Sequence, residues 1–207
     1  MTTVISGFST SLDGFIADPG DDVGPLFDWY TCGDIDPHTE RHPRELRMTA
    51  ASVRHWQDLV DRVGAQVCGR RLFDHTRGWG GNPVFDGPVF VVSHRPPPPD
   101  WPPRPDAPFT FVTSGVEEAV ERAKAAAGED RFVSVAGPDI ARQCLNAGLL
   151  DEVWIDLVPV FLGQGIRYFA DLTPGFLENP RVIEGDRVTH LKYRVRRQKG
   201  QEGPRWA

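Results

Sequence analysis

Short apolar runs rich in β-branched residues alternate along the chain with stretches in which apolar residues recur at helical spacing. The apolar runs predict buried strands at residues 4–8, 65–68, 88–93, 109–112, 131–136 and 153–161. The periodic stretches predict helices at residues 49–63, 70–75, 116–123 and 139–147, and Ser114 and Glu117 have the spacing of a capping box before the third. Such alternation predicts a largely parallel sheet covered by helices on both faces.

The C-terminal part continues this pattern with two further strands, at residues 182–184 and 188–195. Gly185 and Asp186 lie between them and are typical of a tight hairpin turn. We therefore predict an α/β fold of three layers, with a mostly parallel sheet and a C-terminal antiparallel hairpin. A single domain is expected over residues 1–197, followed by a tail at residues 198–207.

Two segments interrupt the alternation without ending the domain. Residues 20–47 are rich in Asp, Pro, Gly and His and show no periodicity, and insertions of this length are usually functional. Phe27, Trp29 and Tyr30 lie close together in the insertion, so we expect it to cover a substrate. Residues 95–108 hold too many prolines for a helix or for ladder pairing, and we interpret them as a stiff surface loop.

The overall composition is that of an ordinary globular protein, with 40% hydrophobic and 25% charged residues. A net charge of −6 disfavours a sequence-independent grip on nucleic acid, which needs a basic surface. No apolar run approaches the ~20 residues of a membrane helix. The first ten residues lack the basic start and long apolar stretch of a signal peptide. We expect a cytoplasmic protein with neither nucleic-acid nor membrane partners.

Two groups of candidate ligands do not form a convincing metal site. Cysteines occur at only three distant positions, which argues against a disulfide framework and against zinc. Two of them, Cys68 and Cys144, lie in apolar surroundings and are expected to be buried, with a catalytic cysteine as the weaker alternative to this. Acidic and histidine side chains also alternate in the insertion and could bind a divalent metal, but we interpret them as a solvated loop and expect no metal. They are Asp34, Asp36, His38, Glu40 and His42.

Three predicted strands end in residues suited to a phosphate. Gly137 and Pro138 join a strand to a helix, and a helix N-terminus at the carboxyl end of a parallel strand can bind a pyrophosphate. Arg70 and Arg71 follow a second strand, and the run Ser93-His94-Arg95 follows a third. Each signal alone is common in α/β proteins. Two basic strand ends in one sheet favour a phosphate site, and a 2′-phosphate explains them better than NAD does.

The order of these motifs carries a resemblance. SLDGFIA, CGRRLFD, VVSHR, VAGPDIARQCLNAGLLDEV and PVFLGQGIRYF follow one another within residues 4–196. In this order the chain resembles the dihydrofolate-reductase-like superfamily, in the branch of the C-terminal reductase domain of the bifunctional riboflavin-biosynthesis deaminase-reductase. The resemblance implies NADPH as the cofactor and hydride transfer to a small heterocyclic substrate. It also implies a homodimer.

The resemblance further implies a role for each matching position. Ser9, Ile16 and Ala17 would lie beside the nicotinamide, and Asp13 near the reacting end of the substrate as the candidate catalytic residue. Gly69, Arg70 and Arg71 would hold the adenosine-side phosphates, and Ser93, His94 and Arg95 the 2′-phosphate. Gly137, Pro138, Asp139 and Ile140 would present main-chain groups to the pyrophosphate. Where this chain has Gly137-Pro138 the family often has a cis Gly-Gly bond, so a cis bond is expected there too.

The substrate stays open between alternatives. The resemblance points to 5-amino-6-(5-phosphoribosylamino)uracil reduction in riboflavin biosynthesis, with a dihydrofolate- or pterin-type reductase as an alternative. The insertion at residues 20–47 replaces a stretch expected of a true riboflavin-pathway reductase, and the acidic residue of folate reduction has no clear counterpart. A different class of protein, a non-catalytic NADPH-binding sensor module, would bind the cofactor without turnover.

Overall fold

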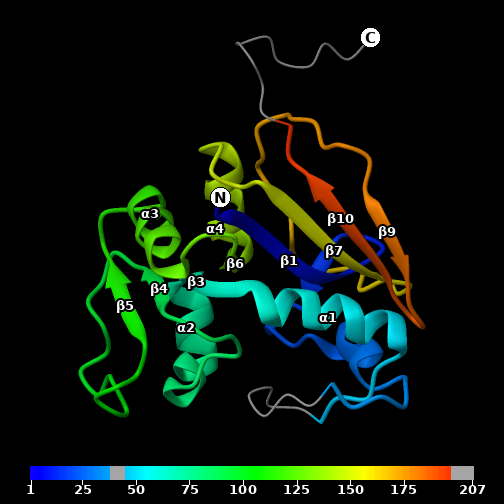
Figure 1. Cartoon of the computed structure of the whole chain (residues 1–207), viewed down its shortest axis with the longest axis horizontal. Coiled ribbons are helices and arrows are strands. Elements are labelled where there is room, and N and C mark those ends of the chain that lie inside the picture. The colour runs from blue at the N-terminus through cyan, green and yellow to red at the C-terminus, as the bar shows by residue number, and fades with distance from the viewer. Residues whose placement is uncertain (38–44, 197–207) are drawn as a thin grey trace.

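A mixed sheet forms the centre of the molecule in the computed structural model, which describes residues 1–37 and 45–196. Within these residues the sheet has eight strands in the order β5-β4-β3-β6-β1-β7-β10-β9 (Figure 1). Neighbours from β5 to β7 pair in parallel, whereas β10 is antiparallel to both β7 and β9. The strands are β1 (Thr3–Ser11), β3 (Val63–Gly69), β4 (Val89–Val92), β5 (Phe109–Val112), β6 (Phe132–Ala136), β7 (Glu152–Val158), β9 (Arg181–Glu184) and β10 (Thr189–Arg194). The predicted mostly parallel sheet and its closing hairpin are confirmed.

Helices cover both faces of this sheet and give the three predicted layers. Figure 1 shows α1 and α2 on one side of the sheet and α3 and α4 on the other. The helices are α1 (Ala50–Arg62), α2 (Arg70–Thr76), α3 (Val116–Ala127) and α4 (Pro138–Asn146), with the 3-10 helices η1 (Gly24–Tyr30) and η2 (Arg77–Gly81). None of the helices in the described part of the chain is long and apolar enough to cross a membrane.

The alternation of side chains along the central strands decides what lies in each layer. Val4 and Val153 pack with α3 and α4, whereas their neighbours Ile5 and Trp154 pack on the opposite face beside Leu59 of α1. Because side chains alternate with a period of two, Asp156 faces the same side as Trp154. The sheet thus presents a carboxylate, flanked in the strand by Ile155 and Leu157, to helix α1.

Part of the insertion packs into the core where the structure describes it, whereas Asp34 is exposed, as expected of a solvated loop. Leu26 and Trp29 of η1 are fully buried and pack in one cluster with Met48 and with Val53 and Trp56 of α1. Trp29 also donates a hydrogen bond from Nε1 to Oγ of Ser9, at 2.9 Å. His38, Glu40 and His42, part of the metal-ligand pattern considered above, lie outside the described residues.

Several details of the predicted elements were wrong. Helix α3 is preceded by Gly115 at φ +112° with no side-chain cap bond, so Ser114 and Glu117 do not form the capping box. The glycine reverses the chain directly, and a side-chain cap is not needed for the turn. Strand β7 ends at Val158 rather than at residue 161. A second, short antiparallel sheet was not predicted; it pairs β2 (Phe15–Ala17) with β8 (Ile166–Arg167).

This small sheet brings two backbones close together next to β1. A Cβ atom added to Gly165, at φ +147°, would lie 2.1 Å from the carbonyl oxygen of Ala17. Gly163, at φ +74°, has nothing within 4 Å of the same position. Both residues share a positive φ that disfavours other residues, but only Gly165 is needed for the close approach.

We therefore expect Gly165→Ala to lower the free energy of unfolding more than Gly163→Ala does. The positive φ alone costs about 1–2 kcal/mol in Gly163→Ala, and about 1–3 kcal/mol in Gly165→Ala, where φ is +147°. The clash with Ala17 adds a further cost of about 1–3 kcal/mol in Gly165→Ala. Urea denaturation of both variants measures the difference. Equal losses in the two variants would show that the close packing of β2 against residue 165 contributes nothing.

Candidate active site

A cleft of about 1530 Å³ lies on the sheet face that α1 and α2 cover. Small-molecule pockets commonly enclose about 300–1,000 Å³, so this cleft can hold a large ligand or two ligands side by side. Phe27 and Tyr30 of η1 line it, as do Trp56 of α1 and Trp154 of β7. These rings give the cleft flat apolar walls at the end nearest η1. The expectation that the insertion covers a binding space therefore has a structural basis in Phe27 and Tyr30, whereas Trp29 is buried in the core.

At the other end of the cleft, two neighbouring strands end in glycine. Cys68 of β3 pairs with Ala136 of β6, so Gly69 and Gly137 follow at adjacent strand ends, and both line the cleft. A Cβ atom on Gly69 would lie 3.1 Å from Ile140 of α4, and one on Gly137 would lie 3.8 Å from the backbone nitrogen of Gly69. The glycines keep this edge free of side chains, so a ligand can reach the backbone.

Helix α4 begins at this edge, and its first residues line the cleft. Pro138 is the first helical residue, where its missing N–H costs nothing. The N–H groups of Asp139 and Ile140 lie in the first turn, which has no acceptors within the helix. The carboxylate of Asp139 accepts hydrogen bonds from Arg142 and, at 2.7 Å, from Gln143. The charge of Asp139 is thereby partly balanced within α4, which reduces its repulsion of an anion at the helix start.

The expected cis bond before Pro138 is not found, and that prediction was wrong. The cis peptide bonds within the described residues do not include Gly137–Pro138, so this bond is trans. Gly137 adopts φ +101° and ψ 130°, and this conformation alone turns the chain from β6 into α4.

The predicted phosphate-binding side chains fall into two groups. Arg71 lines the cleft, is largely exposed, and forms an ion pair with Asp21 at 2.9 Å. Arg70 is not among the residues that line the cleft; its Nε bonds to Asp74 at 2.7 Å and its Nη1 bonds to the carbonyl of Pro96 at 2.8 Å. Arg71 can therefore reach a ligand in the cleft directly, whereas Arg70 holds the loop after β4.

The residues after β4 form a compact turn beside Arg70. Ser93 is buried, and its Oγ donates to the carbonyl of Arg95 at 2.8 Å and accepts from the N–H of Arg95 at 3.1 Å. His94 is exposed, and the Arg95 side chain is 72% exposed, with Nη2 3.8 Å from Asp74. None of Ser93, His94 and Arg95 is among the described residues that line the cleft. The three residues follow Val92, which pairs with the cleft residue Gly69, so they lie together beside the cleft.

The residues predicted to lie beside a nicotinamide are in the cleft. Ser9 of β1 and Ile16 and Ala17 of β2 line the cleft, and each of these residues is no more than 8% exposed. The hydrogen bond from Trp29 to Ser9 fixes η1 against β1 at this place.

Asp13, the predicted catalytic residue, lies in the turn between β1 and β2. Its carboxylate accepts hydrogen bonds from Ser11 Oγ at 2.6 Å and from the N–H groups of Leu162 at 3.2 Å and Gly163 at 2.7 Å. These donors, Ser11 foremost, hold the pKa of Asp13 below its ordinary value. Asp13 does not line the cleft as described, so its catalytic role stays a prediction.

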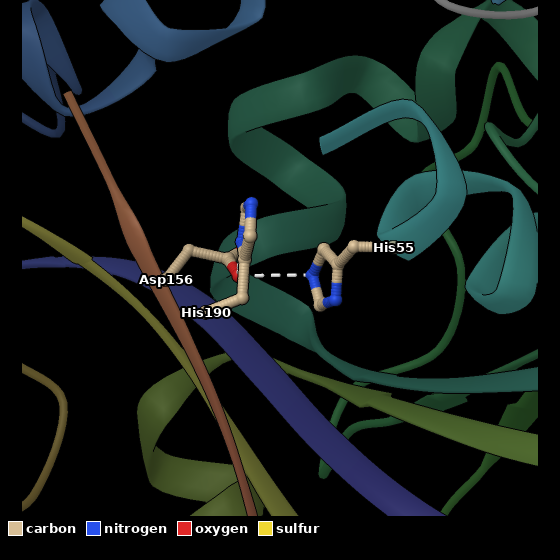
Figure 2. Close-up of side chains that lie close together, drawn as sticks. All are labelled: His55, Asp156 and His190. Atoms are coloured by element: carbon tan, nitrogen blue, oxygen red, sulfur yellow. Dashed lines mark hydrogen bonds and ion pairs between the residues drawn. The ribbon is translucent and has the colours of Figure 1, made fainter. Parts of the chain in front are cut away.

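The cleft contains a polar cluster that the sequence did not reveal. Oδ1 of Asp156 lies 2.9 Å from Nε2 of His55 and 2.7 Å from Nδ1 of His190 (Figure 2). His190 pairs directly with Asp156 across the antiparallel strands β10 and β7, and His55 reaches the same oxygen from α1. The two imidazole rings stack, with centroids 4.0 Å apart.

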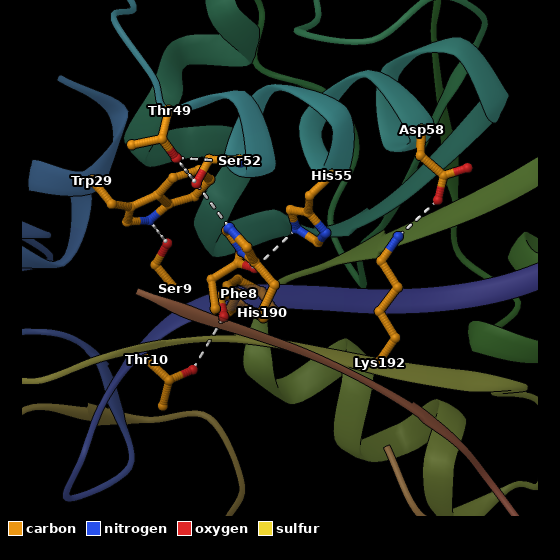
Figure 3. Close-up of polar contacts among 11 residues, drawn as sticks. Phe8, Ser9, Thr10, Trp29, Thr49, Ser52, His55, Asp58, His190 and Lys192 are labelled. Carbon is orange, nitrogen blue, oxygen red and sulfur yellow. Dashed lines mark hydrogen bonds and ion pairs between the residues drawn. The ribbon is translucent and has the colours of Figure 1, made fainter. Parts of the chain in front are cut away.

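A hydrogen-bond chain fixes the orientation of His190. Nε2 of His190 lies 3.0 Å from Oγ of Ser52, which in turn lies 3.3 Å from Oγ1 of Thr49 (Figure 3). With Nδ1–H of His190 donating to Asp156, Nε2 accepts from Ser52, and Ser52 accepts from Thr49. Both nitrogens of His190 are thus engaged, and its side chain is fully buried.

The charge state of the cluster follows from burial and pairing. Burial alone would raise the pKa of Asp156, but the two imidazoles bonded to it lower that pKa well below its ordinary value. Burial also lowers the pKa of His55, and the attraction of Asp156 only partly opposes this effect. At neutral pH, Asp156 is therefore an ionised acceptor and His55 a neutral donor to it.

His55, Asp156 and His190 together also have the chemistry of a metal-ligand set. Their ligand atoms all lie within 4.8 Å of one another. However, both imidazoles approach the same carboxylate oxygen at hydrogen-bond distances, and Ser52 occupies the second nitrogen of His190. The arrangement is that of a hydrogen-bonded cluster.

The cysteines have the expected surroundings. Cys68 and Cys144 are fully buried, as predicted. Burial raises the pKa of each thiol to about 12, so neither forms a thiolate at neutral pH.

Comparison with known proteins identifies the family of this chain. Residues 2–182 match the family described as the RibD C-terminal domain. Over 121 residues the chain is 26% identical to the uncharacterized protein YwjB of Bacillus subtilis. That match covers 57% of this chain and 65% of YwjB, which is less than two thirds of the relative's length.

Solved structures show the same fold at low identity. A Shewanella sp. PV-4 protein named for riboflavin biosynthesis gives a TM-score of 0.69 at 22% identity, covering 94% of this chain and 99% of the other. The deaminase and 5-amino-6-(5-phosphoribosylamino)uracil reductase of Thermotoga maritima gives 0.59 at 14%, covering 94% and 56%. Dihydrofolate reductase from Enterococcus faecalis, complexed with NADP(H), gives 0.54 at 11%, covering 95% and 97%. The predicted dihydrofolate-reductase-like fold is confirmed.

The pKa of His55 predicts how stability depends on pH. The unfolded imidazole takes up a proton below pH ~6.5, whereas the folded one resists it because its pKa is lowered. The free energy of unfolding should therefore fall as the pH falls below ~6.5, with a contribution from His55 of at most about 1.4 kcal/mol per pH unit. Asp156 contributes in a lower window, since its stabilisation is lost only as the pH falls below ~3.9.

Urea denaturation between pH 7 and pH 5 measures this slope. His55→Gln should show a shallower decline than the unmodified protein. His75→Gln serves as the control, because His75 is exposed in the last turn of α2. Equal slopes in the unmodified protein and His55→Gln would contradict the assignment.

Proposed function

The chain belongs to the RibD C-terminal domain family, and we propose that it is an NADPH-dependent reductase that transfers a hydride to a small heterocyclic substrate. The observation that carries this proposal is the composition of the cleft. One end offers glycine-edged strand ends and a helix start, and the other offers aromatic walls around a buried histidine–carboxylate pair. A phosphate-bearing cofactor and a flat ring require these two environments side by side.

The residues at the strand ends fit the phosphate part of a dinucleotide. The open backbone at Gly69 and Gly137 allows close approach, and the first turn of α4 offers N–H groups and the positive end of the helix dipole. Arg71 adds a guanidinium that is exposed to the cleft. When bound, the reduced nicotinamide supplies the hydride.

The chain's own residues would position the reacting ring and exclude water. Ile16 and Ala17 provide a buried apolar surface, held in place by the pairing of β2 with β8. Phe27 and Tyr30 lie over the neighbouring space, and their rings contact each other edge to face at 5.0 Å. A flat apolar surface beside a wall of rings favours a planar heterocycle over an extended aliphatic substrate.

For the substrate we propose a ring of the riboflavin-pathway type, 5-amino-6-(5-phosphoribosylamino)uracil or a close analogue. The family membership and the named activity of the Thermotoga maritima protein support this choice. A dihydrofolate or pterin substrate is the alternative. It is less well supported, because the residue that α1 presents to the cleft beside Asp156 is His55 rather than an acid.

A screen for NADPH oxidation tests the proposed reaction. Loss of reduced-nicotinamide absorbance is followed with 5-amino-6-(5-phosphoribosylamino)uracil, with dihydrofolate and with a quinone. We expect turnover with the uracil. Turnover with dihydrofolate alone would favour the pterin alternative. NADPH binding without oxidation by any of the three would indicate the non-catalytic sensor instead.

We also expect NADPH to bind more tightly than NADH. Arg95 is free to extend from the turn after β4 toward a 2′-phosphate, with Ser93 and Arg70 fixing that turn. Charge-assisted hydrogen bonds contribute about 1.5–3 kcal/mol each, so two of them imply a preference of about a hundredfold or more.

Fluorescence titration of Arg95→Ala checks this assignment. The variant should bind NADPH much more weakly and NADH almost as before. Arg122→Ala is the matched control, since Arg122 is an exposed arginine paired with Glu118 on α3. Equal dissociation constants for NADPH and NADH in the unmodified protein would refute the preference.

A further inference from the structure

His55 has a feature that its packing does not explain. The residue is 3% exposed and lines the cleft, and its Nε2 is committed to Asp156. Its Nδ1 is buried and has no hydrogen-bond partner within residues 1–37 and 45–196. Leaving such an atom unpaired costs about 1–3 kcal/mol, so a partner that arrives with a ligand is the simplest account of it.

Asp156 decides which ring nitrogen of His55 carries the proton. An ionised carboxylate accepts from Nε2–H, so the neutral ring has its lone pair on Nδ1. When the ring takes a second proton, that proton is on Nδ1, the nitrogen that no protein group occupies. His55 can therefore carry a second proton on Nδ1 without breaking its bond to Asp156.

The other polar groups around His55 are engaged elsewhere. His190 uses both nitrogens, on Asp156 and Ser52, and it is not among the residues that line the cleft. Lys192 of β10 lies over the Trp154 ring at 3.5 Å and bonds to Asp58 at 2.7 Å. Asp156, His190 and Lys192 are the charged or titratable groups that influence His55. His55 alone among them combines a place on the cleft wall with an unpaired nitrogen.

We infer that His55 is the proton donor of the reduction, and this inference rests on the proposed function. A hydride from NADPH forms the new C–H bond at the electrophilic carbon of a C=N or C=O group. The π electrons of that bond move to the heteroatom, which takes the proton from Nδ1 of His55. The products are the reduced substrate, with one new C–H bond and one new N–H or O–H bond, and NADP⁺. The imidazole is left neutral and regains its proton from water, while Asp156 stays ionised throughout.

Nitrogen-15 NMR of the histidine-labelled protein tests the geometry without any substrate. We expect the His55 signals, assigned by their loss in His55→Gln, to show Nε2 protonated at neutral pH and Nδ1 gaining a proton as the pH falls. A ring protonated on Nδ1 at neutral pH would overturn the inference. This result does not depend on whether the protein is a reductase.

Kinetics of His55→Gln tests the role itself, with NADPH and 5-amino-6-(5-phosphoribosylamino)uracil, or dihydrofolate if that compound is the one turned over. The glutamine Nε2 can still donate to Asp156, but the variant has no acidic proton at the position of Nδ1. We expect kcat to fall by about 10²–10⁴-fold, with NADPH affinity unchanged. In the unmodified protein the rate should rise as the pH falls through the pKa of His55, and this rise should vanish in the variant.

Arg122→Ala is the control, because Arg122 lies on α3, pairs with Glu118 and is not among the residues that line the cleft; this variant should keep both the rate and the pH profile. A folded His55→Gln variant with unchanged kcat and pH profile would overturn the inference. Failure of the proposed function has a different signature: none of the screened compounds is turned over by the unmodified protein, whereas the NMR titration of His55 proceeds as expected.

Discussion

The hydrogen bonds that hold an ionised Asp156 on the inner face of the sheet are the constraint on which the site depends. A carboxylate that faces a helix rather than water is costly unless donors replace the lost hydration. Both donors are imidazoles, one from α1 and one from β10. Satisfying one charge therefore fixes the helix and the C-terminal hairpin against β7, and it also sets the orientation of the His55 ring. Packing and chemistry are coupled at this group.

The two ends of the cleft use opposite means of recognition. At the ends of β3 and β6, side chains are absent, and what remains is backbone and the start of α4. Near β1 and β7, large rings from η1, α1 and β7 enclose the space. The first environment suits the charged and extended part of a ligand, and the second suits a flat ring that must be shielded from water. The main sheet connects the two ends of the cleft, because β3, β6, β1 and β7 are neighbours that run in the same direction.

The sequence predicted most of the fold and the half of the site that is local in the chain. Short apolar runs and the turn residues between them located the strands. Gly69, Gly137 and Pro138 were recognisable because each lies where a strand is followed by a helix. His55, Asp156 and His190 were missed because they lie in three elements far apart in the chain, and their meeting depends on strand register and on the packing of α1. The one available signal was an Asp inside the apolar run of β7. The short pairing of β2 with β8 was missed for the same reason, since no local pattern specifies it.

The position of β10 in the chain has a consequence for biosynthesis. Synthesis runs from the N-terminus, so His190 leaves the ribosome after the other residues that form the cluster and the cleft walls. Until then the parallel strands can assemble, but Asp156 has His55 as its one imidazole partner. The second imidazole bond to Asp156 can therefore form only after β10 has been synthesised and has paired with β7. The cluster is completed by the part of the domain that is made after the walls of the cleft.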